Sequence, residues 1–309
     1  MMVPTTPGGE VIGVRYREAS GVVDNVIIQN IGNMDGSAVG IGFYNQSPVV
    51  DNGQPPEETS VALSHSTIRN VVGTGILADR ASINLTVDQT VVIGPVQPSS
   101  VVVANGFQLS DGAKGTVQNS FFTDFRSQVP GASGSAFIFL CPGVNGGGVA
   151  SATGNSVRNA DFGAALTYAD GVRLAGNTFV DTQVAVLLQA FQNGLGCSTP
   201  TSPTKNSNIV DNLILDPAEA GIALVNGLLL GSGPGSNTIQ GNSIFTDVTV
   251  PIAPLSIDGR DNVISQNTIF AGPDSEIVDA TTGSGTSSTA NTYDNNRCFG
   301  GIPSDQFCR

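Results

Sequence analysis

The chain has 309 residues, of which 39% are hydrophobic and only 12% are charged, and 39 residues are glycine. This composition is typical of a compact chain that is rich in turns and buries a long core, which excludes a disordered protein. The formal net charge of −13, with only 12 basic residues, argues against nucleic acid and anionic membranes as partners, because both bind clustered lysine and arginine. No apolar run approaches the ~18 residues of a membrane-spanning segment.

The first twenty residues contain one strand-like segment, residues 11–16, and no amphipathic helix. An open end of a stack of strands exposes strand edges and core residues. We therefore expect residues 1–20 to form an incomplete first coil or a cap in front of the repeats that follow. The opening residues Met1-Met2-Val3-Pro4 lack the charged and apolar regions of a signal peptide.

Between residues 21 and 295 the chain repeats a unit of about 22 to 25 residues, and longer units contain insertions. Ten equivalent positions mark these units: Val26, Ser66, Thr90, Ser120, Asn155, Asn177, Asn212, Asn242, Asn267 and Asn291. The residue two positions after the marker is apolar in all ten units, and the residue three positions before it is apolar in nine. This regularity indicates one structural unit that is stacked about ten times.

Around each marker apolar residues alternate with polar ones, which is the period of a β-strand. Each strand is short and is followed by Asn, Gly, Asp or Ser, which accept a left-handed backbone or close a turn. Short strands at a fixed spacing must pair with the equivalent strand of the next coil, ~4.8 Å away. The pattern therefore predicts a parallel β-helix with three strands in each coil.

Five units share one turn motif, and three carry a strand that begins with Gly-Ile. These motifs are GNSV (154–157), GNTF (176–179), DNLI (211–214), GNSI (241–244), QNTI (266–269), GIGF (40–43), GILA (75–78) and GIAL (221–224). Over roughly residues 20 to 295, the chain resembles the right-handed parallel β-helix proteins with pectate-lyase-like coils. The resemblance implies an all-β, single-stranded, right-handed parallel β-helix of about ten coils. It leaves the function open, because that family includes lyases, hydrolases, epimerases, tailspikes and adhesins.

Enzymes of that family place their clefts on the outside of the strand that follows the bend after each marker. Outward-facing residues are expected there in two columns: Gly42, Leu77, Gln108, Ile138, Thr167, Leu187, Ala223, Ser256, Val278, and Tyr44, Asp79, Ser110, Leu140, Ala169, Gln189, Val225, Asp258. The two carboxylates, Asp79 and Asp258, are separated by six coils, about 29 Å. Paired-carboxylate hydrolysis requires ~5 to 9.5 Å. The two carboxylates are therefore too far apart for that reaction. The rest of the expected groove is uncharged, and the catalytic motifs of pectate lyases, polygalacturonases and alginate epimerases are not found.

One patch of this groove could carry chemistry. Tyr44, Asp79 with Arg80, and Asp111 end the first three groove strands, on consecutive coils. A phenol or guanidinium beside two carboxylates could abstract a proton from a uronic acid, while Arg80 or a metal neutralises the substrate carboxylate. The alternative is a salt bridge at the edge of a turn, which contributes little to stability.

A second row of polar residues lies four positions after the markers. Asp124, Asn159, Asp181 and Asp216 fall on four successive coils, so the carboxylates of Asp124, Asp181 and Asp216 could hold calcium. Turns closed by Asx side chains explain the row without a metal. His65, the single histidine, is expected to be an exposed turn residue.

The four cysteines predict two disulfides, Cys141–Cys197 and Cys298–Cys308. Cys141 and Cys197 fall in the same type of turn two coils apart, and Cys298 and Cys308 bracket a short loop that makes residues 296–309 a disulfide-closed cap. Disulfides indicate an oxidising compartment, and hence an extracellular or periplasmic protein whose signal has been removed. The alternative is four free thiols in a cytosolic protein.

Two classes of function remain. The first is a non-catalytic extracellular scaffold or binding surface, which the uncharged groove and the missing motifs favour. The second is a polysaccharide-active enzyme (a lyase, epimerase or hydrolase of an acidic glycan) with its site on the N-terminal coils. The absence of Trp and the four Tyr residues weigh against tight sugar binding in both, because sugar rings commonly pack on aromatic faces.

Overall fold

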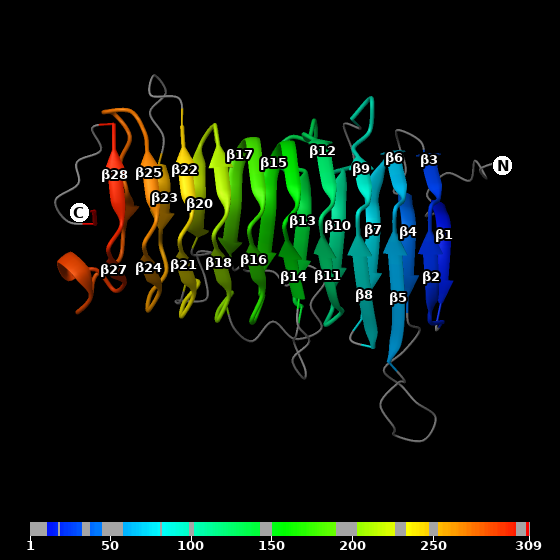
Figure 1. Cartoon of the computed structure of the whole chain (residues 1–309), viewed down its shortest axis with the longest axis horizontal. Helices are drawn as coiled ribbons and strands as arrows, with labels where there is room; N and C mark the ends of the chain where they lie inside the picture. Colours follow the sequence, from blue (N-terminus) through cyan, green and yellow to red (C-terminus); the bar gives the residue numbers. More distant parts are fainter. Residues whose placement is uncertain are drawn as a thin grey trace.

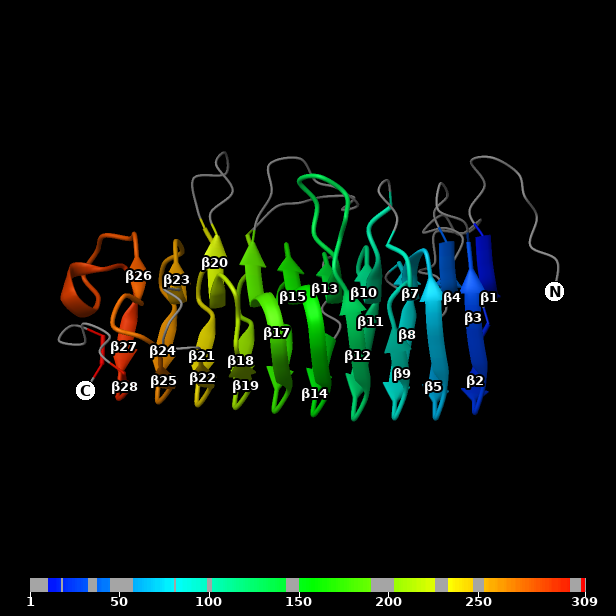
Figure 2. The same cartoon turned by 90° about the horizontal axis from the view of Figure 1, so that it is seen from above.

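The computed structural model describes residues 11–17, 19–32, 38–44, 58–80, 82–98, 102–142, 150–189, 203–225, 233–246, 253–300 and 307–308. These residues wind into a single right-handed parallel β-helix, as predicted. Its coils stack along one axis, with β1 to β3 at one end and β26 to β28 at the other (Figures 1 and 2). The strands of the coils form three faces, A, B and C.

Face A is a ten-stranded parallel sheet. Its strands are β2 (Gly21–Asp24), β5 (Thr59–Ser64), β8 (Ile83–Asp88), β11 (Lys114–Gln118), β14 (Ala150–Thr153), β16 (Arg173–Ala175), β18 (Asn208–Val210), β21 (Thr238–Gln240), β24 (Val263–Ser265) and β27 (Thr292–Asp294). A tight turn that contains the marker residue connects each of these strands to face B.

Faces B and C share two long strands, β15 (Ser156–Thr167) and β17 (Thr178–Gln189), which run from one face into the other. The other strands of face B are β3 (Ile27–Ile31), β6 (Thr67–Val71), β9 (Val91–Ile93), β12 (Phe121–Phe125), β19 (Leu213–Leu215), β22 (Ser243–Phe245), β25 (Thr268–Phe270) and β28 (Arg297–Phe299). Those of face C are β1 (Val11–Arg17), β4 (Ala38–Tyr44), β7 (Gly73–Asp79), β10 (Asn105–Ser110), β13 (Ser135–Leu140), β20 (Ala220–Val225), β23 (Ala253–Ile257) and β26 (Val278–Asp279). A 3₁₀ turn, η1 (Thr286–Ser288), precedes β27.

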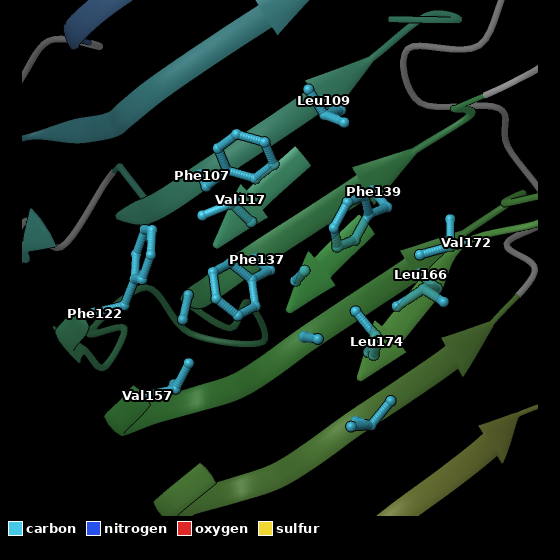
Figure 3. Close-up of a cluster of buried hydrophobic side chains, with 14 of the residues drawn as sticks. Phe107, Leu109, Val117, Phe122, Phe137, Phe139, Val157, Leu166, Val172 and Leu174 are labelled. Carbon is cyan, nitrogen blue, oxygen red and sulfur yellow. The ribbon is translucent and has the colours of Figure 1, made fainter. Parts of the chain in front are cut away.

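The core follows from the strand period, because every second side chain points inward. The predicted column is confirmed from Ile28 to Ile269: its nine members pair in register on successive coils, and each is at most 6% exposed. In the central coils phenylalanines fill the interior (Figure 3). Phe122 and Phe137 meet edge to face, with ring centroids 4.7 Å apart.

The marker turns show why the units repeat. In the first nine units the residue directly before the marker has a left-handed backbone, as His65 (φ 45°) and Asp211 (φ 56°) do. Every marker after the half-buried Val26 is buried, and from Asn155 to Asn267 the marker side chain joins a ladder of amides along the axis. The ladder satisfies main-chain groups that the turn leaves unpaired in the interior.

The tenth marker was assigned incorrectly. The ladder continues from Asn267 to Asn296, and the partner of Ile269 is Cys298, whereas Tyr293 pairs with Ile264 on face A. Asn291 belongs to a second ladder, which includes Asn237 and Asn262 at the other corner of face A. Each of these coils has one asparagine at each corner of face A, and the two are five residues apart. The sequence pattern alone therefore fits a marker at either asparagine.

The stack of strands extends to Phe299 in β28, beyond the expected boundary at residue 295, and β1 pairs with β4 as the rung before β2. The predicted disulfide between Cys298 and Cys308 is present, with Cα atoms 5.6 Å apart. Cys197 lies outside the described residues, so the Cys141–Cys197 pairing stays a prediction. No helix in the described part of the chain has the length and apolar character that crossing a bilayer requires.

Candidate functional site

The outside of face C carries two rows of side chains, which are two residues apart along each strand. Successive members of a row lie on neighbouring strands. The first row runs through Leu77, Gln108 and Ile138, and the second through Asp79, Ser110 and Leu140, as predicted. At β15 the prediction was wrong by two residues. Ala165 follows Ile138, and Thr167 follows Leu140, in place of Thr167 and Ala169. Ala165 stands ten positions after the marker Asn155, as its partner Leu187 stands ten positions after Asn177, and the prediction did not apply this equal spacing to β15.

A groove of about 420 Å³ lies on these rows in the central coils. Its floor is built by outward-facing residues of β13, β15 and β17. One wall is the loop of residues 126–134, which connects β12 to β13. The lining residues are Gly131, Ala132, Ser133, Ser135, Ile138, Leu140, Phe162, Ala165, Thr167, Tyr168 and Gln189.

The wall is fixed at both ends by a carboxylate from the next coil. Asp161 is 8% exposed, and its Oδ2 accepts hydrogen bonds from the main-chain N–H groups of Ser127 (2.7 Å) and Gly134 (2.8 Å). Arg126 compensates the charge, because its Nη1 lies 3.6 Å from Asp161 Oδ1. The loop is therefore held by charge-assisted hydrogen bonds, which are stronger than neutral ones.

The groove has an apolar floor and a few neutral polar groups. Gln189 Nε2 donates to Thr167 Oγ1 at 3.0 Å, and both side chains line the groove. Burial raises the pKa of the Tyr168 phenol, so this group stays protonated at neutral pH. None of the described residues that line the groove carries a carboxylate, ammonium, guanidinium or imidazole group. These described residues can bind a ligand by apolar contact and hydrogen bonding.

The predicted catalytic patch lies on the N-terminal coils of the same face. Tyr44, Asp79 and Ser110 are register partners, which places the ends of β4, β7 and β10 on adjacent rungs. The Arg80 Nε lies 3.9 Å from Asp79 Oδ2, and both side chains are partly exposed. Asp111 directly follows Ser110. The side chain of Tyr44 lies outside the described residues, so the catalytic role of the patch stays a prediction.

Two residues of this region were missed by the sequence argument. Arg15 and Arg17 on β1 pair with Gly42 and Tyr44, so they continue the two rows of face C by one coil. Both are exposed. The alternation of residues 11–16 was the available signal, but the prediction of an incomplete first coil or a cap did not extend the two rows onto this segment.

The row proposed for calcium lies at the corner between faces B and C. Asp124, Asn159, Asp181 and Asp216 all have left-handed backbones, with φ between 50° and 69°. Arg126 donates to Asn159 Oδ1 (3.1 Å) and to Asp181 Oδ1 (3.2 Å), and Asn159 donates to Asp124 Oδ1 (2.8 Å). No three His, Cys, Asp or Glu side chains of the described residues are grouped so as to hold a metal ion. Calcium binding by this row is untested.

His65 is exposed, as expected, and is paired across one coil. Its Nδ1 lies 2.8 Å from Asp24 Oδ1, to which the Ser64 hydroxyl also donates at 2.8 Å. These hydrogen bonds hold the pKa of Asp24 below its ordinary value, and the hydrogen bond with His65 has the larger effect. The three side chains lie on the edge of face A, away from the groove.

A family model described as "Right handed beta helix region" matches residues 56–245. Solved structures with similar folds include a mannuronic acid specific polysaccharide family 6 lyase from human gut microbiota (TM-score 0.45, 11% identity, 96% of this chain and 84% of that one). Another is the A-module of a mannuronan C-5 epimerase from Azotobacter vinelandii (TM-score 0.38, 12% identity, 95% and 86%). A third is the Dettilon tailspike protein (TM-score 0.36, 12% identity, 86% and 57%). Similarity at this level carries no argument about activity. No curated protein sequence matches the chain.

Proposed function

The chain belongs to the family that is defined by a right-handed β-helix region. We propose that it is a non-catalytic binding protein, because the described lining of its groove is uncharged. The β-helix is the rigid scaffold, and the groove over β13, β15 and β17 is the binding site. We propose a neutral saccharide as its ligand. The Cys298–Cys308 disulfide supports an extracellular or periplasmic location, because such bonds persist in oxidising compartments.

The observation that carries the proposal is the uncharged lining of a groove whose wall is fixed in place. A sugar ring presents C–H groups on its faces and hydroxyl groups at its edge. Ile138, Leu140 and Ala165 offer apolar contact, and Ser133, Thr167 and Gln189 offer hydrogen bonds. The volume of about 420 Å³ falls within the ~300 to 1,000 Å³ of ligand pockets. A polyanionic glycan finds no cation among the described residues that line this groove, and it meets a chain with a net charge of −13.

Titration calorimetry tests the proposal with soluble fragments of a neutral glucan, a neutral mannan and a polyuronate. We expect a neutral fragment to bind and the polyuronate not to bind. Ile138→Arg should abolish binding at the groove, because it places a guanidinium on the groove floor. Ile93→Arg is the matched control, since Ile93 is a half-buried, outward-facing isoleucine on face B. Equal loss of binding in both variants, or selective binding of the polyuronate, would contradict the proposal.

The N-terminal patch supports a second candidate function, the processing of an acidic glycan. The supporting observation is the register of face C, which gathers Arg15, Arg17, Asp79 and Arg80 around the end of β4. Guanidinium groups could bind uronate carboxylates. If this candidate is correct, polyuronates should yield an unsaturated or epimerised product, and Asp79→Asn and Arg80→Ala should each abolish turnover without unfolding the chain. Unchanged polyuronates would reject it.

A further inference from the structure

The outer surface of face B carries a row of exposed phenylalanines at its C-terminal end. Phe245, Phe270 and Phe299 are register partners on the successive strands β22, β25 and β28, which lie side by side in Figure 1. They are 39%, 40% and 49% exposed. The rings of Phe245 and Phe270 are stacked, with centroids 6.4 Å apart and planes inclined by 27°. We call these three residues the phenylalanine strip.

A polar hollow of about 590 Å³ lies beside the strip. It is lined by Gln266, Thr268, Asn295 and Arg297, which come from β25, β28 and the turns before them. Thr268 and Arg297 are register partners, and each stands two residues before a phenylalanine of the strip. Arg297 is exposed and makes no ion pair with any other described residue. Exposed aromatic rings and planar hydrogen-bonding groups thus adjoin on one surface.

A second copy of this chain is a poor occupant for the strip. With a fully exposed aromatic side chain taken as roughly 200 Å², the exposed part of the three rings sums to roughly 250 Å². A stable protein interface buries about 800 Å² on each partner. The strip is also only one ring wide, since the next row on these strands holds Ser243, Thr268 and Arg297.

We propose that the phenylalanine strip and the adjoining hollow form a saccharide-binding site that takes an extended, neutral glycan chain. The C–H groups of successive sugar rings pack against Phe245, Phe270 and Phe299, whose strands are separated by the coil rise of ~4.8 Å. The Arg297 guanidinium and the amides of Gln266 and Asn295 bind ring hydroxyls. A polyanion is disfavoured because the hollow offers one cation and the chain carries a net charge of −13. This site lies on another face than the groove and does not depend on it.

The test uses the full chain with soluble fragments of a neutral glucan, xylan and mannan as probes. Phe270→Ser should weaken the binding of the preferred fragment by roughly tenfold or more, as loss of one aromatic contact predicts. Val263→Ser is the matched control, because Val263 is 42% exposed and faces outward on β24 in the same coil. It should bind as the parent chain does. Ile138→Arg in the groove should leave binding at the strip unchanged, which separates this site from the groove.

Three outcomes would overturn the inference. The first is that Phe270→Ser does not weaken the binding of any neutral fragment. The second is that Phe270→Ser and Val263→Ser weaken binding equally. The third is that the parent chain is a dimer in solution and Phe270→Ser makes it a monomer, which would assign the strip to a second copy. Thermal unfolding of each variant shows whether the fold is retained.

Discussion

Asn177 and Asn212 occupy the same corner of successive coils, and Oδ1 of Asn212 accepts hydrogen bonds from both the main-chain N–H and the side-chain Nδ2 of Asn177, each at 3.0 Å. Asn177 repeats this contact with Asn155, and its Nδ2 also donates to the carbonyl of Ala152. One side chain therefore satisfies polar groups of two coils inside a dry core.

This relationship predicts a large effect for Asn177→Ala. The substitution leaves the main-chain N–H of Asn155 buried without its acceptor, and each such group costs about 1 to 3 kcal/mol. We expect the free energy of unfolding to fall by about 3 kcal/mol, measured by urea denaturation. Thr178→Ala, on the outward-facing neighbour, should change it by less than about 0.5 kcal/mol. A similar small effect of Asn177→Ala would mean that the ladder does not stabilise the fold.

Phe179 tests the core column. It is fully buried between Val157 and Ile214, so Phe179→Ala should leave a cavity and lower the free energy of unfolding by about 3 to 5 kcal/mol. The control is Val180→Ala, whose side chain points outward from the same strand. If both variants unfold at the same denaturant concentration, the assigned register is incorrect.

Asp161 links the stability of the groove wall to ligand binding. Asp161→Asn replaces the carboxylate that accepts from Ser127 and Gly134 and that pairs with Arg126. We expect faster amide exchange in residues 127–134 and weaker saccharide binding in the groove. Asp216→Asn, at the exposed corner two coils away, should change neither. Unaltered exchange in the Asp161 variant would show that the wall is held by other contacts.

The Asp24–His65 pair predicts a local pH dependence. Because hydrogen bonds lower the pKa of Asp24 in the folded chain, the stabilisation is present above the pKa of the unfolded chain. It is lost as the pH falls through the lower, folded-state value. A carboxyl titration by NMR should place the pKa of Asp24 below 3.8, and His65→Ala should raise it. An unchanged pKa in that variant would exclude the hydrogen bond as its cause.

The fold was predictable because its determinants are local. The inward column, the turn before each marker and the outward rows of β7, β10 and β13 all follow from residues within one coil. A left-handed turn residue followed by a buried amide can be read directly from motifs such as those around Asn177 and Asn242. Register between neighbouring coils then follows, because every coil repeats the same period.

The errors arose where the determinant lies outside one coil or where two solutions look alike. Asn291 and Asn296 both fit a marker turn, and only the pairing of Ile269 with Cys298 decides between them. The groove wall was not foreseen, because Asp161 fixes residues that are 27 and 34 positions away in the sequence. Exposed phenylalanines are likewise unremarkable in the sequence until the register places Phe245, Phe270 and Phe299 side by side.

Amide hydrogen exchange with and without the preferred neutral saccharide tests the central proposal most directly, because it locates the bound ligand on the chain. The groove predicts protection of residues 131–133 and 165–168 at saturating ligand. The phenylalanine strip predicts separate protection of residues 266–270 and 295–299, which Phe270→Ser should remove without affecting the groove. Protection confined to residues 79–80 and 111 would contradict this account and place the ligand at the N-terminal patch.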